Sequence, residues 1–372
     1  METVNQILSL LAEAVHLLGA WWSKTLGAWW SNDPGAWPGA LLTAWPLRET
    51  LQTALLALAI ERIIGWPGFL QKLTGHPVEW MGGMIGRLEK KWNDPRASFA
   101  MRRFRGMVMM AALILFWGVL AWLLHRALNM ALGQYGWLAE ALAASSLLAQ
   151  SALRRHVRDV ADALAEHPGD LNPARRAVGR IVGRFTDEMD ESKVAHAAIE
   201  SLAENTSDGI VAPAFWLALA GLPGMVIYKL VNTGDSMVGY RSERFLAFGW
   251  AAARLDDLMN LIPARLTGLL LAMAAAITSP AAGARALHVM WRDGRKHVSP
   301  NAGWPEAAMA GALDITLGGP RSYPGGVTAD FPHLGDGRER LTRRDIHRAL
   351  SLYGQMLTMM LLLGFFFWLF VA

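Results

Sequence analysis

Long runs of apolar residues dominate the chain and alternate with short polar connections. The clearest run covers residues 107–124, eighteen uncharged residues closed by His125 and Arg126. At about 1.5 Å of rise per residue, a helix of this length approaches the thickness of the hydrocarbon core of a bilayer. Further candidate spans are residues 349–372, 266–284 (where Pro280 is expected to end the helix), 127–153 (interrupted only by Glu140) and the short segment 50–60 between charged ends.

Basic residues concentrate in three of the polar connections. Residues 83–105 carry seven lysines and arginines, residues 154–208 carry eight, and residues 285–348 carry ten. Short connections rich in Lys and Arg stay in the cytoplasm by the positive-inside rule, so we place all three there. The N-terminus, where Lys24 and Arg48 are the only cations of the first 48 residues, is then expected outside.

The first 45 residues contain six of the seventeen tryptophans, in a repeat of eight residues that places Trp21, Trp29 and Trp37 in equivalent positions. A stripe of this kind is typical of the lipid–water boundary, where indole rings are stable. An aromatic box for a ligand is the alternative. No basic region precedes the segment, so it is not a signal peptide. We therefore predict an interfacial extension over residues 1–48 and a membrane domain over residues 49–372.

The composition supports a membrane protein and narrows the chemistry. Of the 372 residues, 53% are hydrophobic and 18% are charged, below the roughly 25% charged that is typical of soluble proteins. The net charge of +4 is too small and too scattered for a nucleic-acid reader. Without cysteine, disulfides, Cys-ligated zinc, iron–sulfur clusters and thiol nucleophiles are excluded. The familiar phosphate-loop, dinucleotide and zinc-protease motifs do not occur, so a nucleotide needs an unconventional site.

Three acids, Glu200, Glu204 and Asp208, recur every four residues in an alanine-rich segment that is predicted to be helical. At about 100° per residue they share one face, with a drift of roughly 40° per step. A solvated helix face is the ordinary explanation of such a stripe. Here it leads directly into twenty uncharged residues, 209–228, that contain Pro213 and Pro223. Acids at the mouth of a broken apolar segment are more often functional, so we predict a cation or metal–phosphate site.

Polar residues suited to phosphate and magnesium follow in two further segments. Residues 232–244 are rich in hydroxyl, amide and charged side chains, and Arg254, Asp256, Asp257, Asn260 and Arg265 come soon after. Residues 291–306 combine a basic run with a loop punctuated by Pro and Gly. His76, which precedes a proline, is by itself more typical of a turn than of a site.

These segments resemble the CobD/CbiB family, the integral-membrane adenosylcobinamide-phosphate synthases of cobalamin biosynthesis. The resemblance runs in order from about residue 51 to about residue 319, and the Trp-rich N-terminus lies outside it. The motifs that carry it are HPVEWMGGMIGRL (76–88), ESLAENTSDGIVAPAFW (200–216), YKLVNTGDSMVGYRSER (228–244), FGWAAARLDDLMNLIPARLT (248–267) and SPNAGWPEAAMAGAL (299–313).

The resemblance implies an amide synthesis that consumes ATP and requires Mg²⁺. The propionate carboxylate of adenosylcobyric acid is joined to the amine of (R)-1-aminopropan-2-ol phosphate, with an acyl phosphate as the plausible intermediate. Mg²⁺ is expected at Glu200, Glu204 and Asp208, and Glu204 is also expected to be catalytic. Asp235 or Asp257 is expected to accept the ammonium proton.

Substrate contacts are also expected from the matching positions, with the arginines holding phosphate or carboxylate oxygens. The predicted substrate-binding residues are His76, Asn205, Thr206, Ser207, Asn232, Ser236, Arg241, Arg244, Arg254, Arg265, Asn301, Trp304 and Glu306. The chain departs from the usual family pattern at Trp66 and Phe185, where acids are common, and at Gly234 and Ser242, where Leu and Asn are commoner.

Two alternative functions are compatible with the same membrane spans and broken apolar segment. An AmpE-like membrane sensor or modulator retains the fold without the synthesis. A small-anion transporter uses the broken helix near Pro213 as its substrate site.

We therefore expect an all-α polytopic protein of the bacterial inner membrane, with about five hydrophobic helices, cytoplasmic helical connections and a cytoplasmic active face. If residues 209–228 and 266–284 both span fully, residues 232–265 lie outside, away from Glu200 and Glu204. The prolines and glycines favour a re-entrant or buried hairpin that returns this loop to the acidic helix. The expected partners are the corrinoid and aminoalcohol phosphate substrates, the lipid bilayer and other membrane enzymes of corrinoid synthesis, but no nucleic acid.

Overall fold

The computed structural model describes residues 47–66, 75–167, 169–183, 185–323 and 327–371, and these residues are mostly helical. The predicted all-α class is confirmed, and the departure within the described ranges is an antiparallel hairpin of two strands. The Trp-rich segment 1–46 lies outside the described residues, so its interfacial position stays a prediction. The elements are α3 (Leu47–Ile64), α5 (Pro77–Trp92), α6 (Phe99–Leu132), η1 (Gly133–Tyr135), α7 (Gly136–Ser145), α8 (Gln150–Glu166), α9 (Asn172–Val178), α10 (Glu191–Thr206), η2 (Ser207–Val211), α11 (Ala212–Val238), α12 (Trp250–Met259), α13 (Leu261–Thr278), α14 (Pro280–Asp293), α15 (Gly303–Leu313), β1 (Leu317–Tyr323), β2 (Val327–Leu334) and α16 (Arg343–Phe370).

Four stretches of described helix are long and apolar enough to cross a membrane: Phe99–Glu166, Glu191–Val238, Leu261–Thr278 and Arg343–Phe370. The runs predicted over residues 107–124 and 349–372 lie in α6 and α16. The run over 266–284 ends as expected, because α13 stops at Thr278 and Pro280 begins α14. Segment 50–60 lies within α3, which is apolar but is not one of the four stretches.

The run over residues 127–153 is not one helix. Helix α6 ends at Leu132, the next residue, Gly133, has a positive φ of 55°, and a short turn leads into α7. Glu140 of α7 fastens this turn, because its Oε1 lies 2.8 Å from His125 Nδ1 and accepts a hydrogen bond from Asn129 Nδ2 at 2.7 Å. The acid that interrupts the apolar pattern therefore joins two helices, and the expected separate span is divided among α6, α7 and α8.

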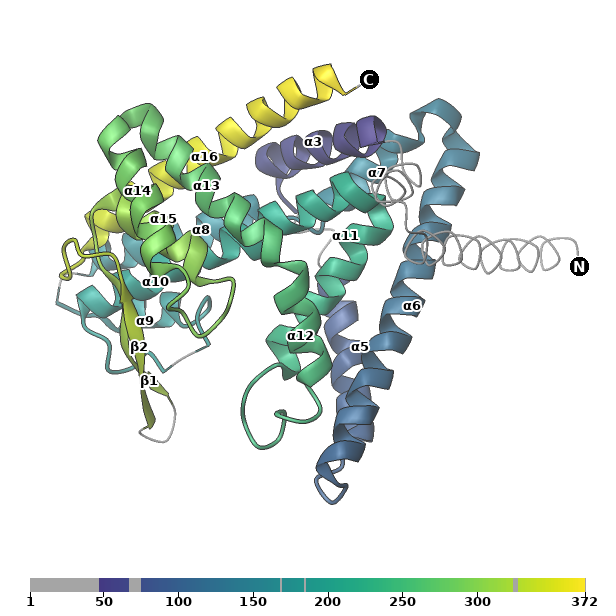
Figure 1. Cartoon of the computed structure of the whole chain (residues 1–372), viewed down its shortest axis with the longest axis horizontal. Coiled ribbons are helices and arrows are strands. Elements are labelled where there is room, and N and C mark those ends of the chain that lie inside the picture. The colour runs from purple at the N-terminus through teal and green to yellow at the C-terminus, as the bar shows by residue number, and fades with distance from the viewer. Residues whose placement is uncertain (1–46, 67–74, 168, 184, 324–326, 372) are drawn as a thin grey trace, which may run out of the picture.

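The helices form two groups that α11 and α10 connect (Figure 1). Helix α6 runs along one edge of the molecule and packs against α11, while α13, α14 and α15 pack together on the other side. Helix α15 is buried along its whole length, and Ala307, Ala308 and Ala310 are fully covered. Small side chains let neighbouring backbones approach closely, which explains the alanine-rich packing.

Helix α11 is broken in its middle. Ala220 and Gly221 leave helical geometry, Gly221 has a φ of 61°, and Pro223 follows inside the helix. A proline in a helix removes one hydrogen bond and clashes with the preceding turn, and glycine tolerates the positive φ. The break that the prolines and glycines predict is therefore present.

The loop between α11 and α12 contacts the basic segment 83–105, which includes the end of α5 and the start of α6. Arg244 donates to both carboxylate oxygens of Glu89 at 3.0 Å, and Asn93 Nδ2 donates to the carbonyl of Arg244 at 3.0 Å. A side chain at Gly106 of α6 would collide with the carbonyl of Phe248, so the two backbones lie in direct contact. This loop thus lies on the same side of the molecule as residues 83–105, as the buried-hairpin hypothesis requires.

Candidate functional site

Carboxylates from four consecutive elements lie near one another. Glu204 lies in the last turn of α10, Asp208 lies in η2, Asp235 lies in the second half of α11, and Asp256 lies in α12. Asp256, Glu204 and Asp235 all interact electrostatically with Asp208. Residues that are up to 52 positions apart therefore form one acidic cluster, which we define as Glu204, Asp208, Asp235 and Asp256.

A π-helical turn, η2, presents Asp208 to the cluster. Such a turn widens the helix by one residue and is frequent at functional sites. The Tyr228 hydroxyl fixes it from the next helix, since it lies within hydrogen-bond distance of the Asp208 carbonyl at 3.1 Å and of Asn260 Oδ1 at 2.9 Å. Tyr228 is fully buried, so this link ties η2 to the end of α12.

Two amides hold the Asp256 carboxylate. Asn232 Nδ2 donates to one oxygen at 3.2 Å, and Asn260 Nδ2 donates to the other at 3.0 Å. Lys229 Nζ donates to Asn232 Oδ1 at 3.3 Å, and its charge lies within electrostatic reach of Asp208 and Asp256. Burial raises the pKa of Asp256, although these amide hydrogen bonds act in the opposite direction. The carboxylate is therefore oriented but incompletely neutralised.

Two arginines and a buried amide surround Asp257, the residue that follows Asp256 in α12. Arg254 donates to Asp257 Oδ2 at 3.2 Å, and Arg241 is near enough to interact with the same carboxylate. Burial raises the pKa of Asp257 despite these cations. Asn301 Nδ2 donates to the Asp257 carbonyl at 2.8 Å, and its Oδ1 accepts from Arg265 at 3.3 Å. The loop before α15 is thereby joined to the acidic cluster.

The remaining residues of the α15 motif are buried beside Asn301. Trp304 is 2% exposed and Glu306 is 1% exposed. The Glu306 carboxylate lies 4.0 Å from His297, at the edge of salt-bridge range.

His76 caps the N-terminus of α5, where its Nδ1 accepts a hydrogen bond from the Val78 amide at 3.2 Å. Its ring meets the edge of Trp66 at 5.4 Å between centroids, and burial lowers the pKa of His76. Lys229 is close enough to His76 to interact electrostatically, so the first motif approaches the cluster. Trp66 is therefore part of the packing around the histidine.

Several predicted residues are engaged in other contacts. Glu200 is buried, and its Oε1 accepts a hydrogen bond from the Gly318 amide of β1 at 2.8 Å. Arg244 is held by Glu89, as described above. Helix hydroxyl and amide groups bond to their own backbone: Thr206 to Leu202, Asn205 to Ser201, and Ser236 to Asn232. Ser207 is buried, and its hydroxyl has no partner among the described residues.

No set of three or more described His, Asp or Glu side chains is close enough to hold a metal ion alone. Glu204 interacts electrostatically with Asp208, whereas Glu200 is not among the groups that act on Asp208 and accepts a hydrogen bond from the Gly318 amide. The cluster offers hard oxygen donors, and Mg²⁺ commonly binds through one or two carboxylates, water and substrate phosphates. The donor set thus fits Mg²⁺ brought with a nucleotide.

Comparison with known proteins agrees with the motifs. The family model for the CobD/CbiB protein matches residues 54–353. The chain belongs to the CobD/CbiB family. Proteins named cobalamin biosynthesis protein CobD are similar to it: one from Sinorhizobium sp is 49% identical over 80% of this chain and 92% of its own length, and one from Rhodobacter capsulatus is 50% identical over 80% and 91%. A third, from Brucella anthropi, is 47% identical over 82% and 93%. No solved structure matches the chain.

Sequence patterns alone do not single out several residues that the structure places at the acidic cluster. Lys229 and Tyr228 belong to a motif, and Asp256 and Asn260 belong to a polar segment without any local feature that sets them apart. A lysine within a long apolar helix is itself a functional signal, because an uncompensated charge there is costly. No local signal shows that Asp256, and not the adjacent Asp257, joins the acidic cluster. The two acids differ only in the helix face on which they lie, and the sequence does not show which face is buried.

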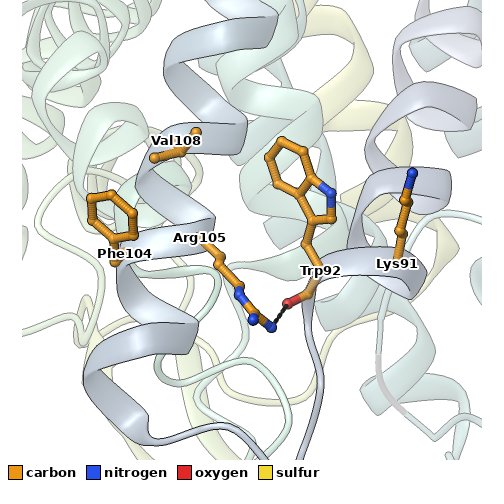
Figure 2. Close-up of a pocket in the computed structure, with 5 residues that line it drawn as sticks. All are labelled: Lys91, Trp92, Phe104, Arg105 and Val108. Carbon is orange, nitrogen blue, oxygen red and sulfur yellow. Dashed lines mark hydrogen bonds between the residues drawn. The ribbon is translucent and has the colours of Figure 1, made fainter.

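A separate groove of about 390 Å³ lies between the end of α5 and the start of α6. Figure 2 shows its lining, in which Arg105 donates to the Trp92 carbonyl at 3.3 Å. None of the residues predicted from the CobD/CbiB motifs lines it; the lining residues are Lys91, Trp92, Phe104, Arg105 and Val108.

Proposed function

We propose that this chain is an adenosylcobinamide-phosphate synthase, which joins adenosylcobyric acid to (R)-1-aminopropan-2-ol phosphate with consumption of ATP. The observation that carries the proposal is the convergence of family motifs on one cluster of carboxylates, amides and arginines. Membership of the CobD/CbiB family supports it. The AmpE-like alternative is not favoured, because the relatives carry the name of a cobalamin biosynthesis protein.

The reaction needs an activated carboxylate, because a carboxylate does not acylate an amine unaided. One oxygen of the corrinoid propionate attacks the γ-phosphorus of ATP, the bond from that phosphorus to the bridging oxygen breaks, and ADP leaves. The free amine then attacks the acyl carbon, and inorganic phosphate departs with the propionate oxygen. The substrate's ammonium group loses two protons in all, one before the attack and one as the amide forms.

Glu204 and Asp208 would hold Mg²⁺, which when bound neutralises charge on the nucleotide phosphates. The chain's own cations act beside it: Arg241 and Arg254 lie near Asp257, and Lys229 lies within the cluster. Guanidinium groups bind phosphate oxygens bidentately, so these arginines are suited to orient the transferred group.

Asp257 and Asp235 are the groups proposed to accept the proton of the ammonium. Burial raises the pKa of Asp257, and a carboxylate with a raised pKa is a stronger proton acceptor near neutral pH. Asp256, held by Asn232 and Asn260, fixes the negative potential that attracts the ammonium to this position. The proton thus moves toward a carboxylate while the arginines hold the phosphate.

We place the enzyme in the bacterial inner membrane with this site facing the cytoplasm. The support is the contact of the α11–α12 loop with residues 83–105, which the positive-inside rule assigns to the cytoplasm. ATP and the pathway intermediates are made on that side. Other membrane enzymes of corrinoid synthesis are proposed as further partners.

The test uses the full chain in nanodiscs with ATP, MgCl₂, adenosylcobyric acid and (R)-1-aminopropan-2-ol phosphate, with product measured by mass spectrometry. Asp256→Asn keeps the side-chain volume and removes the charge that two amides orient. We expect the product rate to fall at least 100-fold, about 2.7 kcal/mol of barrier. Asp162→Asn, at an exposed position of α8, is the matched control and should retain the wild-type rate. Absence of product from folded wild-type protein would refute the proposal.

A further inference from the structure

Two arginines lie against the ring of one buried tryptophan, Trp304. The guanidinium carbon of Arg265 is 4.4 Å from the centroid of the Trp304 ring, and that of Arg295 is 5.9 Å from it. The indole itself is fixed, because its Nε1 donates to the Pro300 carbonyl at 3.0 Å and Trp291 packs edge-on at 5.2 Å. Trp304 is therefore a rigid platform for both cations.

Neither arginine has a carboxylate partner among the residues that the structure describes. Arg265 donates to neutral acceptors, the Leu261 carbonyl at 2.6 Å and Asn301 Oδ1 at 3.3 Å. Arg295 is exposed, and its charge acts on Arg265 as a repulsive neighbour. Two like charges held together lack the compensation that an anion supplies. The two guanidinium groups therefore form a positively charged pair that solvent reaches at Arg295.

The neighbouring cations of the same segment, Arg292 and Lys296, do have a carboxylate partner. Arg292 and Lys296 both bond to the buried carboxylate of Asp293, at 2.7 and 2.6 Å. The one buried acid of this turn thus neutralises the residues on either side of Arg295 and not Arg295 itself. Arg295 thus differs from Arg292 and Lys296, because no carboxylate among the described residues pairs with it.

We propose that Arg265 and Arg295 form a phosphate-binding subsite on the Trp304 platform, an inference that rests on the proposed function for the identity of its ligand. Paired guanidinium groups present forks of N–H donors that match phosphate oxygens. Asn301 joins Arg265 to the carbonyl of Asp257, so the subsite is connected to α12, the helix that carries Asp256 of the acidic cluster. The phosphate belongs to a substrate, either the phosphomonoester of the aminoalcohol or the triphosphate of ATP.

Steady-state kinetics of the full chain in nanodiscs distinguishes the two sources. Arg295→Gln and the double variant Arg265→Gln/Arg295→Gln should raise KM at least tenfold for one phosphate-bearing substrate. A rise for the aminoalcohol phosphate assigns the subsite to the phosphomonoester, and a rise for ATP assigns it to the triphosphate. KM for adenosylcobyric acid should stay within twofold, and Arg158→Gln on exposed α8 should behave as wild type. A rise confined to the corrinoid, or no rise above twofold for either phosphate substrate, overturns the inference.

A second measurement does not depend on turnover. Phenylglyoxal modifies exposed arginines, and mass spectrometry can map the modified positions with and without inorganic phosphate. Phosphate should slow modification of Arg295 at least threefold and leave that of Arg158 unchanged. Equal rates at Arg295 with and without phosphate would contradict the subsite. Protection in a protein that makes no amide would keep the subsite and refute the proposed function instead.

Discussion

The carboxylate of Asp293 holds together the turn that presents Arg295. It is fully buried at the end of α14 and accepts hydrogen bonds from Arg292 at 2.9 and 2.7 Å, from Lys296 at 2.6 Å and from the Gly335 amide at 2.8 Å. Asp293→Asn keeps the shape but places an NH₂ group against these donors. The substitution therefore breaks a charge network without creating a cavity.

The expected loss of folding stability depends on how exposed Arg292 and Lys296, the partners of Asp293, are. Removing one member of a buried ion pair costs about 3–5 kcal/mol when the other charge stays buried. The side chains of Arg292 and Lys296 are 35% and 50% exposed, so both recover water. The loss should then be about 2–3 kcal/mol. At an unfolding entropy of about 2.1 cal/mol/K per residue, this lowers the apparent melting temperature of a chain of 372 residues by roughly 3–4 °C.

The pH dependence has a definite sign. Burial alone would raise the pKa of Asp293, but the bonds from Arg292, Lys296 and the Gly335 amide outweigh it and hold this pKa well below its usual value. A depressed pKa contributes stability above the unfolded pKa of about 3.9, and this stability is lost as the pH falls below it. The advantage of the wild-type protein over Asp293→Asn should therefore begin to shrink below about pH 5 and go on shrinking as the pH falls toward the depressed folded-state pKa of Asp293.

Thermal unfolding in nanodiscs from pH 7 to pH 3, followed by circular dichroism, measures both effects. Asp336→Asn is the matched control, because Asp336 also accepts from Arg292, at 3.0 Å, but its side chain is 72% exposed. The control should shift the melting temperature by less than about 2 °C, as surface ion pairs contribute little. The reasoning is wrong if Asp293→Asn melts within 2 °C of the wild-type protein at pH 7. It is also wrong if the difference between their melting temperatures does not shrink between pH 7 and pH 3.

Three further predictions concern topology, the N-terminus and the metal. Ser98→Cys and Ser322→Cys, in a chain without cysteine, should resist impermeant thiol reagents in intact cells; labelling of both from outside would reverse the orientation. Deletion of residues 2–40 should reduce membrane yield but keep turnover per folded molecule within about threefold, under 1 kcal/mol of barrier; a loss of orders of magnitude would place the tryptophans in the site. Glu204→Gln should cut synthesis at least about 100-fold while leaving stability without Mg²⁺ level or higher; normal turnover, with equal stabilisation of variant and parent by Mg²⁺, would make the stripe a solvated face.

The apolar pattern predicts most of the fold, because membrane crossing depends on the length and hydropathy of single segments. It places α6, α13 and α16 and the break in α11 near Pro223. The hairpin of β1 and β2 was not predicted, since its strands are short and its backbone pairing, with a bulge near Gly319, leaves little periodicity in the sequence.

The site is predictable only in part, because its geometry depends on contacts between distant segments. Regular helical spacing aligns Glu200 with Glu204 and Asp208, but Asp208 lies in a π turn and Glu200 accepts a hydrogen bond from the Gly318 amide, and neither feature can be seen in the spacing. Nothing in the local sequence shows that Arg244 pairs with Glu89, 155 residues earlier. The same long-range packing brings Lys229 and Asp256 together, which motif reading left in the background.

The measurement that tests the central claim most directly follows the carboxylate oxygen of the corrinoid. Adenosylcobyric acid labelled with ¹⁸O in its free propionate is incubated with the purified chain, ATP, MgCl₂ and (R)-1-aminopropan-2-ol phosphate. The account predicts adenosylcobinamide phosphate and ADP in equal amounts, with one labelled oxygen transferred to each inorganic phosphate. Amide formation without ATP, label in AMP instead of phosphate, or no amide from folded protein would contradict it.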